Sequence, residues 1–392
     1  MFKEKTSQAV EILKELDIDI WLTFVRETHT LHDPSLHFLC PTALTWQSAL
    51  MICRDGEKTA IVGNLDLAAV ADTKIFDNVI SYKNDIKPEL LASIKRKKPG
   101  KIAINYSKDS EMSDGLTHGM FLILSEYLEE TDFKSSLVSA EKIVSALRGR
   151  KTPEEIRRMK KAAKYTQKIF DGVGGYMKPG MSEKQVAEFM LARLKEMCLE
   201  TSWDAATCPS VFTGPDTAGA HFGPTDRKIE PGHILNIDFG VKYEDYVSDM
   251  QRTWYFLRPG ENEPPEEVKK GFEVLLGSIK ASAEALKPGV QGKDIDMIAR
   301  QYIVKHGYEE FPHALGHQLG RAAHDGHGLL CPEWERYGDR PYLKAEQGQV
   351  YTIEPRLTVK DHGVVTIEEE VIVTENGCEY ISEPQTELYV IK

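Results

Sequence analysis

The sequence predicts an α/β protein of two domains, a small mixed α/β domain followed by a larger α+β domain. Three observations support this prediction. Apolar runs of strand length alternate with amphipathic segments over residues 1–150, a helix-capping pattern starts at residue 152, and a weak repeat divides the remainder into two halves. The length of 392 residues fits two to three domains at roughly 150 residues each.

The first domain, residues 1–150, begins with an amphipathic helix that the apolar spacing predicts over residues 6–16. Helices are also expected between the strands of this domain. Four apolar runs have the length and composition of strands, and they lie at residues 20–24, 49–53, 59–63 and 101–105. This order of elements predicts a small mixed α/β domain.

A domain boundary is predicted at residues 148–151. Thr152 can cap the start of a helix, Pro153 suits the first helical position, and Glu155 supplies the acid of a capping box. A long charged amphipathic segment follows, as expected for the first helix of a new domain. The second domain therefore spans residues 151–392.

The second domain contains a weak internal repeat. KPGMSEKQVAEFMLARL from Lys178 resembles KPGVQGKDIDMIARQYI from Lys287, since each has a helix end, a Pro-Gly break and a new amphipathic helix. Duplicated halves are the interpretation, and a coincidental similarity of two helix-turn-helix segments is the alternative. The two copies precede segments that carry metal-type ligands, so a site at the seam between the halves is expected.

Composition limits the classes of partner. The formal net charge of −12 disfavours nucleic acid and an anionic membrane surface, because both favour a basic face. Residues 1–20 carry charges throughout, so neither a signal peptide nor a membrane span is expected, and a cytoplasmic location follows as the prediction. The six cysteines show no C-x-x-C spacing, which disfavours a disulfide framework or a cysteine zinc site.

The segment HILNIDFGVKYEDYVSDMQRTWYF (233–256) predicts two antiparallel strands joined by a turn at residues 242–245. Asp238 and Asp249 can then meet across the hairpin. Asp238 lies on the face opposite the larger apolar residues, and a buried acid at that position needs a cation. The alternative is that both acids lie on the surface of an exposed hairpin.

The segment HALGHQLGRAAHDGHG (313–328) holds four histidines: His313, His317, His324 and His327. His313 and His317 are four residues apart, but the glycines around them disfavour the regular helix of zinc proteases. An irregular or strand-like active-site segment is expected instead. A single histidine is usually a core or surface residue, whereas a cluster of four indicates a ligand or charge nearby.

The segments VYTIEPRL (350–357) and VVTIEEEVIVT (364–374) are β-branched runs in which acids interrupt an apolar pattern. Such interruptions are expected where a carboxylate points into a core to hold a metal. In the second run, side-chain alternation places Glu369 on the face opposite Glu368 and Glu370. The spacing alone leaves the choice between Glu368 and Glu370 open.

Together these segments supply four carboxylates and one imidazole, an oxygen-rich set of hard ligands. Such a set suits two adjacent divalent ions, such as manganese, cobalt or zinc, better than one tetrahedral structural zinc. The chemistry that it indicates is two-metal hydrolysis.

The motifs resemble those of the pita-bread metallopeptidases, the family of prolidase, Xaa-Pro aminopeptidase, methionine aminopeptidase and creatinase. DFG with SDMQRT, GHQLG with AHD, TIEP, and IEEEV followed by IVT occur in the order of that family, and the match covers nearly the whole chain. The first domain and the linker LRGRKTPEEIRRM resemble the creatinase, prolidase and Xaa-Pro branch. The resemblance implies a creatinase/prolidase-like N-terminal domain over residues 1–150 and a pita-bread catalytic domain with duplicated halves over residues 151–392.

The resemblance also implies a role for each ligand. Asp238 would chelate one metal, Asp249 and Glu368 would bridge the pair, and His317 with Glu354 would hold the second ion. The resemblance thereby selects Glu368 rather than Glu370 as the metal ligand. A hydroxide bridging both ions would attack the scissile carbonyl.

Further roles follow from the same matching. Glu354 looks like the proton shuttle, and His313 resembles a substrate-pocket histidine. His221 in GAHFG and His324 in AAHD resemble the histidines that steady the tetrahedral intermediate and the leaving nitrogen.

The implied function is a dinuclear-metal exopeptidase that removes an N-terminal residue preceding proline, from a dipeptide or a longer peptide. Many relatives are dimeric, so a homodimer is expected. Two alternatives are metal-free hydrolysis of a C–N bond, as in creatinase, and an inactive binding protein on the same fold. Relatives of both kinds lose metal ligands, whereas all five are present here.

The chain departs from the family at two positions. Thr366 lies where an arginine commonly precedes the second metal glutamate by two residues, and Arg356 replaces the glycine usual after Glu-Pro. The hypothesis is that Arg356 compensates, because a guanidinium near the site could bind a substrate carboxylate through two hydrogen bonds.

Overall fold

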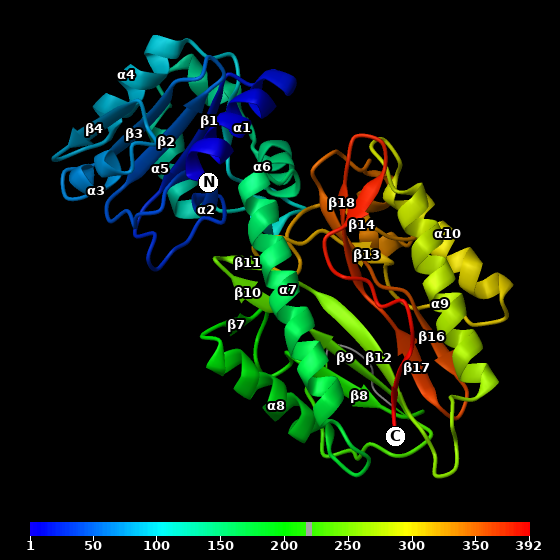
Figure 1. Cartoon of the computed structure of the whole chain (residues 1–392). Helices are drawn as coiled ribbons and strands as arrows, with labels where there is room; N and C mark the ends of the chain where they lie inside the picture. The colour runs from blue at the N-terminus through cyan, green and yellow to red at the C-terminus, as the bar shows by residue number, and fades with distance from the viewer. Residues whose placement is uncertain (217–221) are drawn as a thin grey trace. The chain divides into compact units, whose positions relative to one another are not determined.

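The structure is a computed structural model that describes residues 1–216 and 222–392. The chain divides into two compact units, Met1–Arg148 and Gly149–Lys392 (Figure 1). No helix in the described residues is long and apolar enough to span a lipid bilayer.

The first unit is built on one mixed sheet with the strand order β4-β3-β2-β1-β5-β6. All four strands predicted from the sequence are present, and the short outer strands β4 and β6 are additional. The strands are β1 (Ile20–Val25), β2 (Ser48–Cys53), β3 (Lys58–Gly63), β4 (Asn78–Tyr82), β5 (Ile102–Ile104) and β6 (Leu137–Ser139). The helices are α1 (Phe2–Glu15), α2 (Leu36–Leu39), α3 (Leu67–Asp72), α4 (Lys87–Lys97), α5 (His118–Tyr127) and α6 (Glu141–Gly149), with 3-10 turns η1 (Glu111–Ser113) and η2 (Asp132–Ser136).

Helices cover both faces of this sheet. Alternating side chains of β1 enter two separate cores: Trp21 packs in the core that includes α1, α2 and α6, whereas Leu22 packs in the core that includes α4 and α5. Strand alternation explains this division, because successive side chains point to opposite faces. The first unit is therefore a three-layer α/β/α arrangement.

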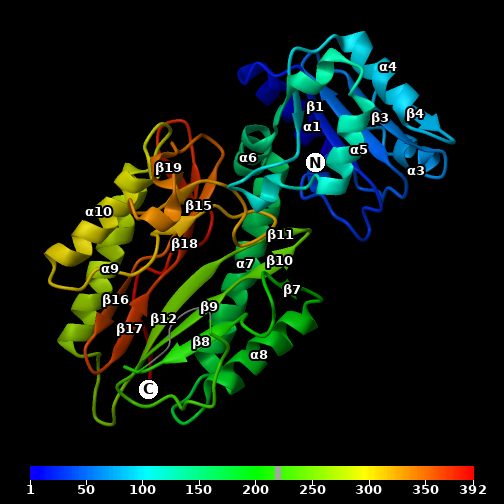
Figure 2. The ribbon, with the colours of Figure 1, turned by 180° about the vertical axis from the view of Figure 1, so that it is seen from behind.

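The second unit contains two helix pairs, each packed on its own strands (Figures 1 and 2). The helices are α7 (Pro153–Tyr176), α8 (Glu183–Glu196), α9 (Glu266–Ala285) and α10 (Gly292–Lys305), with 3-10 turns η3 (Glu335–Tyr337) and η4 (Arg340–Tyr342). The strands of the first half are β7 (Glu200–Thr201), β8 (Ser210–Thr213), β9 (Ile234–Phe239), β10 (Val241–Tyr243), β11 (Tyr246–Val247) and β12 (Met250–Phe256). The remaining strands are β13 (Gly316–His317), β14 (Leu329–Leu330), β15 (Val350–Ile353), β16 (Arg356–Val359), β17 (Gly363–Thr366), β18 (Glu369–Val373), β19 (Cys378–Tyr380) and β20 (Tyr389–Ile391).

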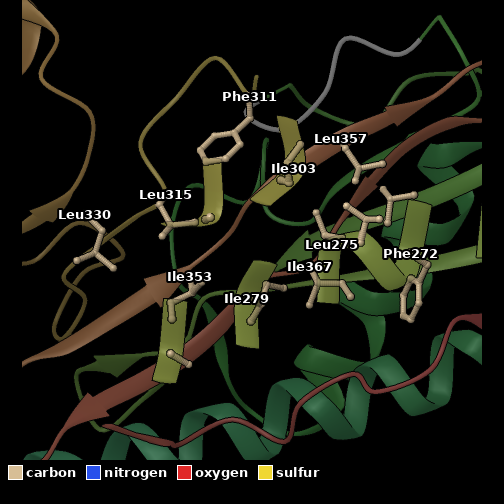
Figure 3. Close-up of a cluster of buried hydrophobic side chains, with 14 of the residues drawn as sticks. Phe272, Leu275, Ile279, Ile303, Phe311, Leu315, Leu330, Ile353, Leu357 and Ile367 are labelled. Carbon is tan, nitrogen blue, oxygen red and sulfur yellow. The ribbon is translucent and has the colours of Figure 1, made fainter. Parts of the chain in front are cut away.

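The second unit has two hydrophobic cores. Helices α7 and α8 pack with β8, β9 and β12, and α9 and α10 pack with β15 to β18. Phe272, Leu275 and Ile279 lie three and four residues apart, so they form one face of α9 (Figure 3). Ile353 and Ile367 enter the same core. The acids that directly follow these two isoleucines are thereby directed away from α9, because neighbouring side chains in extended backbone diverge.

The two β-branched runs form strands that are each interrupted once. The first is divided into β15 and β16 at Glu354 and Pro355, and the second into β17 and β18 at Ile367 and Glu368. Strand β15 pairs with β18, and β16 pairs with β17. Pro355 has no N–H to donate, which explains the break in the first run. Both acids therefore lie at a joint between two strand pairs.

The predicted hairpin is present, but its turn is tighter than expected. Strands β10 and β11 enclose a two-residue turn in which Glu244 and Asp245 have positive φ angles of 45° and 68°. Short turns of this handedness fit the twist of paired strands. Asp238 therefore lies opposite Gln251 rather than opposite Asp249. The difference is two residues, which leaves all side chains on their predicted faces.

The capping box at the start of α7 is formed as predicted. The Thr152 side chain accepts a hydrogen bond from the Glu155 backbone N–H at 3.4 Å, and the Glu155 carboxylate accepts one from the Thr152 backbone N–H at 2.7 Å. Glu155 also accepts a hydrogen bond from the Tyr246 hydroxyl at 2.8 Å. The cap thus connects the helix to the β10–β11 hairpin.

Replacing Thr152 with Ala is expected to lower the free energy of unfolding by about 1 kcal/mol, because an N-terminal N–H of α7 loses its acceptor. Urea unfolding followed by circular dichroism at 222 nm would measure this loss. Thr152→Ser keeps the hydroxyl and should retain the wild-type midpoint. Equal midpoints for the Ala and Ser variants would contradict the prediction.

Candidate metal centre

Asp238 and Asp249 come from the two strands of the long hairpin. Asp238 is on β9, Asp249 directly precedes β12, and each is 6% exposed. Their carboxylates lie next to each other, since the charge of Asp238 raises the pKa of Asp249. The Asp249 backbone N–H donates to Glu370 Oε1 at 2.6 Å. The hairpin therefore brings the two aspartates together in a buried position.

The other three predicted ligands, His317, Glu354 and Glu368, lie close together, and Asp249 is next to them. His317 Nε2 is 3.3 Å from Glu354 Oε1, 3.8 Å from Asp249 Oδ2 and 3.9 Å from Glu368 Oε1. One ligand atom each from Asp249, His317 and Glu368 lies within 4.8 Å of the others. Because Asp249 also contacts Asp238, the structure brings together all five residues that the sequence indicated as ligands.

Backbone hydrogen bonds hold the second-half ligands in place. The His317 N–H donates to Thr352 Oγ1 at 3.1 Å, and the Glu354 N–H donates to the Leu315 carbonyl at 2.8 Å. Residues 313–328 form no helix, as expected, and contain the two-residue strand β13, which pairs with β14 directly after the segment. His317 is consequently presented from the short strand β13.

The carboxylates repel one another strongly. Burial, followed by the charge of Glu354, raises the pKa of Asp238 to about 8. Burial and the charge of Asp238 raise the pKa of Asp249 well above its ordinary value, and burial and the charge of Asp249 do the same for Glu368. Only Glu354 differs: burial raises its pKa, but the hydrogen bond and charge of His317 outweigh burial and lower it.

This arrangement fits a divalent metal. Asp238 Oδ1 and Glu368 Oε1 are buried and have no hydrogen-bond partner among the described residues. Buried acids with free oxygens are costly unless a cation compensates them. The donor set of carboxylate oxygens and one imidazole nitrogen suits hard or borderline divalent ions.

The three consecutive glutamates divide between two faces. Glu369 forms a buried ion pair with Arg252, at 3.1 Å between Oε1 and Nη1, whereas Glu368 and Glu370 face Asp249. Glu368 is the one that reaches His317. Glu370, which the spacing had left as the alternative to Glu368, has its pKa raised to about 8, first by burial. The sequence did not single out Gln251, whose side chain contacts two of the glutamates.

The other predicted histidines lie in different places. The ring of His324 stands edge-on to His317, with 4.3 Å between centroids, and its charge lowers the pKa of Glu354. His313 donates a hydrogen bond through Nδ1 to the Ala314 carbonyl at 2.7 Å, and burial lowers its pKa. His327 instead lies 3.7 Å from Asp339. His221 lies outside the described residues.

Arg356 and Thr366, the two departures from the family pattern, are direct cross-strand partners on β16 and β17. Side chains of such partners share one face of the sheet. Arg356 is partly buried, and burial lowers the pKa of its guanidinium. The Arg356 charge in turn lowers the pKa of His313, so the guanidinium lies on the side of the predicted substrate pocket.

Residues 157–375, more than half of the chain, match the family model of metallopeptidase family M24. The chain belongs to metallopeptidase family M24. The family implies a divalent metal, and the centre described above supplies ligands for one. The resemblance to the pita-bread metallopeptidases is therefore confirmed.

Relatives of this M24 metallopeptidase include an uncharacterized peptidase of Staphylococcus aureus (strain MSSA476), which is 34% identical over 218 residues. The match covers 55% of this chain and 57% of that protein, so the chain spans little more than half the length of this relative.

Solved structures share the fold over nearly the full length. The Xaa-Pro dipeptidase from Bacillus anthracis has a TM-score of 0.74 at 23% identity, with complete coverage of both chains. The X-Pro aminopeptidase from Thermotoga maritima MSB8 has a TM-score of 0.71 at 23% identity, covering 98% of this M24 chain and 99% of its own. The prolidase from Pyrococcus horikoshii OT3 has a TM-score of 0.68 at 24% identity, with coverage of 98% and 99%. The expected fold class is therefore confirmed.

Proposed function

We propose that this protein is a dinuclear-metal-dependent exopeptidase that hydrolyses the peptide bond between an N-terminal residue and proline, in dipeptides or longer peptides. The observation that carries this proposal is the convergence of Asp249, Glu354 and Glu368 on His317 Nε2, with Asp238 next to Asp249. The shared fold with proteins named Xaa-Pro dipeptidase, X-Pro aminopeptidase and prolidase supports the choice of substrate.

Two divalent ions, of manganese, cobalt or zinc, would be held by the five ligands. Asp249 is suited to both ions, since its carboxylate contacts Asp238 on one side and approaches His317 on the other. Glu368 would likewise bind both ions. Glu354 and His317 would complete the ligands of the second ion. Bound divalent ions would lower the pKa of a water molecule to about 7 and polarise the scissile carbonyl.

The protein side chains would handle the protons. The net lowering of the Glu354 pKa keeps this carboxylate ionised near neutral pH, so it can accept a proton from the attacking water. His324, next to His317, would donate to the leaving nitrogen or to the developing oxyanion. His221 would share this role, on the basis of its sequence motif. The lowered pKa of His313 keeps its imidazole neutral in the substrate pocket.

Arg356 is proposed to bind the C-terminal carboxylate of a dipeptide. Replacing it with Ala is expected to raise KM for an Xaa-Pro dipeptide about 10- to 100-fold, because a charged hydrogen bond contributes about 1.5–3 kcal/mol. The same variant should show an unchanged KM for the corresponding Xaa-Pro amide, which lacks the carboxylate. Initial-rate kinetics on both substrates would measure this, and equal effects on both would contradict the role.

The substrate class is tested with metal-reconstituted protein and four substrates: an Xaa-Pro dipeptide, an Xaa-Pro tripeptide, a Met-initiated peptide and creatine. Chelator-sensitive cleavage of an Xaa-Pro substrate is expected, and the ratio of dipeptide to tripeptide rates distinguishes a dipeptidase from an aminopeptidase. Cleavage of creatine alone, or chelator-insensitive hydrolysis, would contradict the proposal. Metal-free C–N hydrolysis and an inactive binding role are not favoured, because all five ligand side chains converge.

We also propose that residues 1–150 are a creatinase/prolidase-like N-terminal domain, that residues 151–392 are the catalytic domain, and that the protein is a cytoplasmic homodimer. The division into two compact units near residue 150 supports the first two statements. Light scattering after size-exclusion chromatography would test the dimer, with a mass of about twice the 44.2 kDa of the chain expected.

A further inference from the structure

Gln251 connects two of the proposed metal ligands through its side chain. Its Nε2 donates to Glu368 Oε2 at 2.9 Å and to Glu354 Oε2 at 3.2 Å. Gln251 is 3% exposed, so these hydrogen bonds form away from water. One amide group therefore contacts the second carboxylate oxygen of both glutamates.

The other oxygen of each glutamate faces the metal centre. Oε1 is the oxygen of each glutamate that approaches His317 Nε2, at 3.3 Å for Glu354 and 3.9 Å for Glu368. Glu368 Oε1 is buried without a hydrogen-bond partner among the described residues. The amide thus occupies Oε2 on both side chains and leaves Oε1 directed at the ligand nitrogen of His317.

The Gln251 amide is itself held by Thr366. The Thr366 hydroxyl lies 3.0 Å from Gln251 Oε1, and it is also 3.3 Å from the Pro355 carbonyl. Ionised carboxylates, the form that binds a metal, can only accept hydrogen bonds, so the amide nitrogen must face them and the amide oxygen must face the hydroxyl. The orientation of the amide is consequently fixed by its neighbours.

The backbone of Gln251 holds the same glutamate. Its carbonyl accepts a hydrogen bond from the Glu368 N–H at 3.2 Å, in an isolated antiparallel bridge between β12 and the joint that follows β17. Main chain and side chain of one residue therefore both fix Glu368 relative to the hairpin that carries Asp249.

A neutral amide suits this position. Lysine or arginine would form ion pairs with the glutamates and compete with a metal for their charge, and an acid would add a further repelling carboxylate. Glutamine supplies two donors without changing the net charge of the centre.

We propose that Gln251, anchored by the Thr366 hydroxyl, is a positioning residue that orients Glu354 and Glu368 so that Oε1 of each is available to the metal ions. The inference rests on the proposed metal centre. It assigns a role to Thr366, one of the two positions at which the chain departs from the family pattern.

The test measures cobalt binding directly. Metal-free protein is titrated with Co²⁺, and the dissociation constant and the visible absorption spectrum are recorded. Gln251→Met, which keeps the length of the side chain but lacks donors, is expected to bind Co²⁺ about 10- to 100-fold more weakly, as when outer partners of metal ligands are removed. Its spectrum should also change, because the geometry of the ligands changes.

Matched variants distinguish a loss of ligand positioning from a general loss of stability. Gln349→Met makes the same change at another buried glutamine of the same unit, whose side chain contacts Glu346 and Tyr351, and should bind Co²⁺ as the wild type does. Thr366→Val removes the anchoring hydroxyl and should weaken binding, whereas Thr366→Ser retains the hydroxyl and should restore the affinity and the spectrum.

Wild-type affinity and spectrum in both Gln251→Met and Thr366→Val would overturn the inference. If Gln251→Met does not fold, as judged by its near-UV circular dichroism, the comparison of Thr366→Val with Thr366→Ser decides. Failure of the proposed function would give a different result from failure of this inference. The wild-type protein would then bind Co²⁺ with the expected dependence on Gln251 and Thr366 but would cleave no Xaa-Pro substrate.

Discussion

Replacing Asp249 with Asn is expected to lower kcat/KM for an Xaa-Pro dipeptide by about 10³-fold or more, which corresponds to about 4 kcal/mol of activation free energy. Asp249 lies between Asp238 and the cluster of His317 and Glu368, so its loss removes a ligand from both proposed ions. An amide offers one neutral oxygen where the carboxylate offers two charged ones. Initial rates and the metal content of the dialysed protein would be measured together.

Asp361→Asn is the matched control for this variant. Asp361 is exposed on the turn between β16 and β17, and its φ of 63° is one that asparagine also adopts readily. This control should retain wild-type activity and metal content. Wild-type activity in Asp249→Asn, or an equal loss in both variants, would contradict the assignment of Asp249 as a ligand.

Chelated protein is expected to become less stable as the pH rises from about 5 to about 9. The pKa values of Asp238 and Glu370 are raised to about 8, whereas an unfolded chain has carboxyl pKa values of about 4. Between these values the folded state holds more protons than the unfolded state, so the free energy of unfolding falls with increasing pH. A decrease in Tm of about 5–10 °C is expected by differential scanning calorimetry.

Saturating Mn²⁺ should largely remove this pH dependence, because a bound cation stabilises the ionised carboxylates in the folded state. Asp238→Asn lacks one of the titrating groups and should show a shallower dependence in the chelated form. Identical slopes for chelated wild type, chelated Asp238→Asn and the Mn²⁺-saturated protein would contradict the explanation.

The sequence predicted the main features of the centre because its signals are local. Asp238, His317 and Glu354 each interrupt an apolar or glycine-rich segment, and such interruptions are visible within a few residues. The capping box at Thr152 is equally local, since it depends on the spacing to Glu155. Strand alternation also placed Glu369 correctly on the face opposite Glu368.

Features that depend on distant contacts were not predictable in the same way. The register of the hairpin follows from the backbone of Glu244 and Asp245, and the pattern of apolar residues is unchanged by a shift of two. The contact of Gln251 with Glu354 joins residues more than a hundred positions apart. No spacing within one segment indicates such a pair, so Gln251 had no signal in the sequence alone.

The second unit has two hydrophobic cores but one set of ligands, with the aspartates from the first half and the histidine and glutamates from the second. Neither half supplies the full set of proposed ligands by itself. Binding therefore ties together two regions that could otherwise open independently, much as a covalent cross-link would. If the proposed ions are bound, the free energy of metal binding would stabilise both halves of the second unit together, and local opening of either half would release the ions.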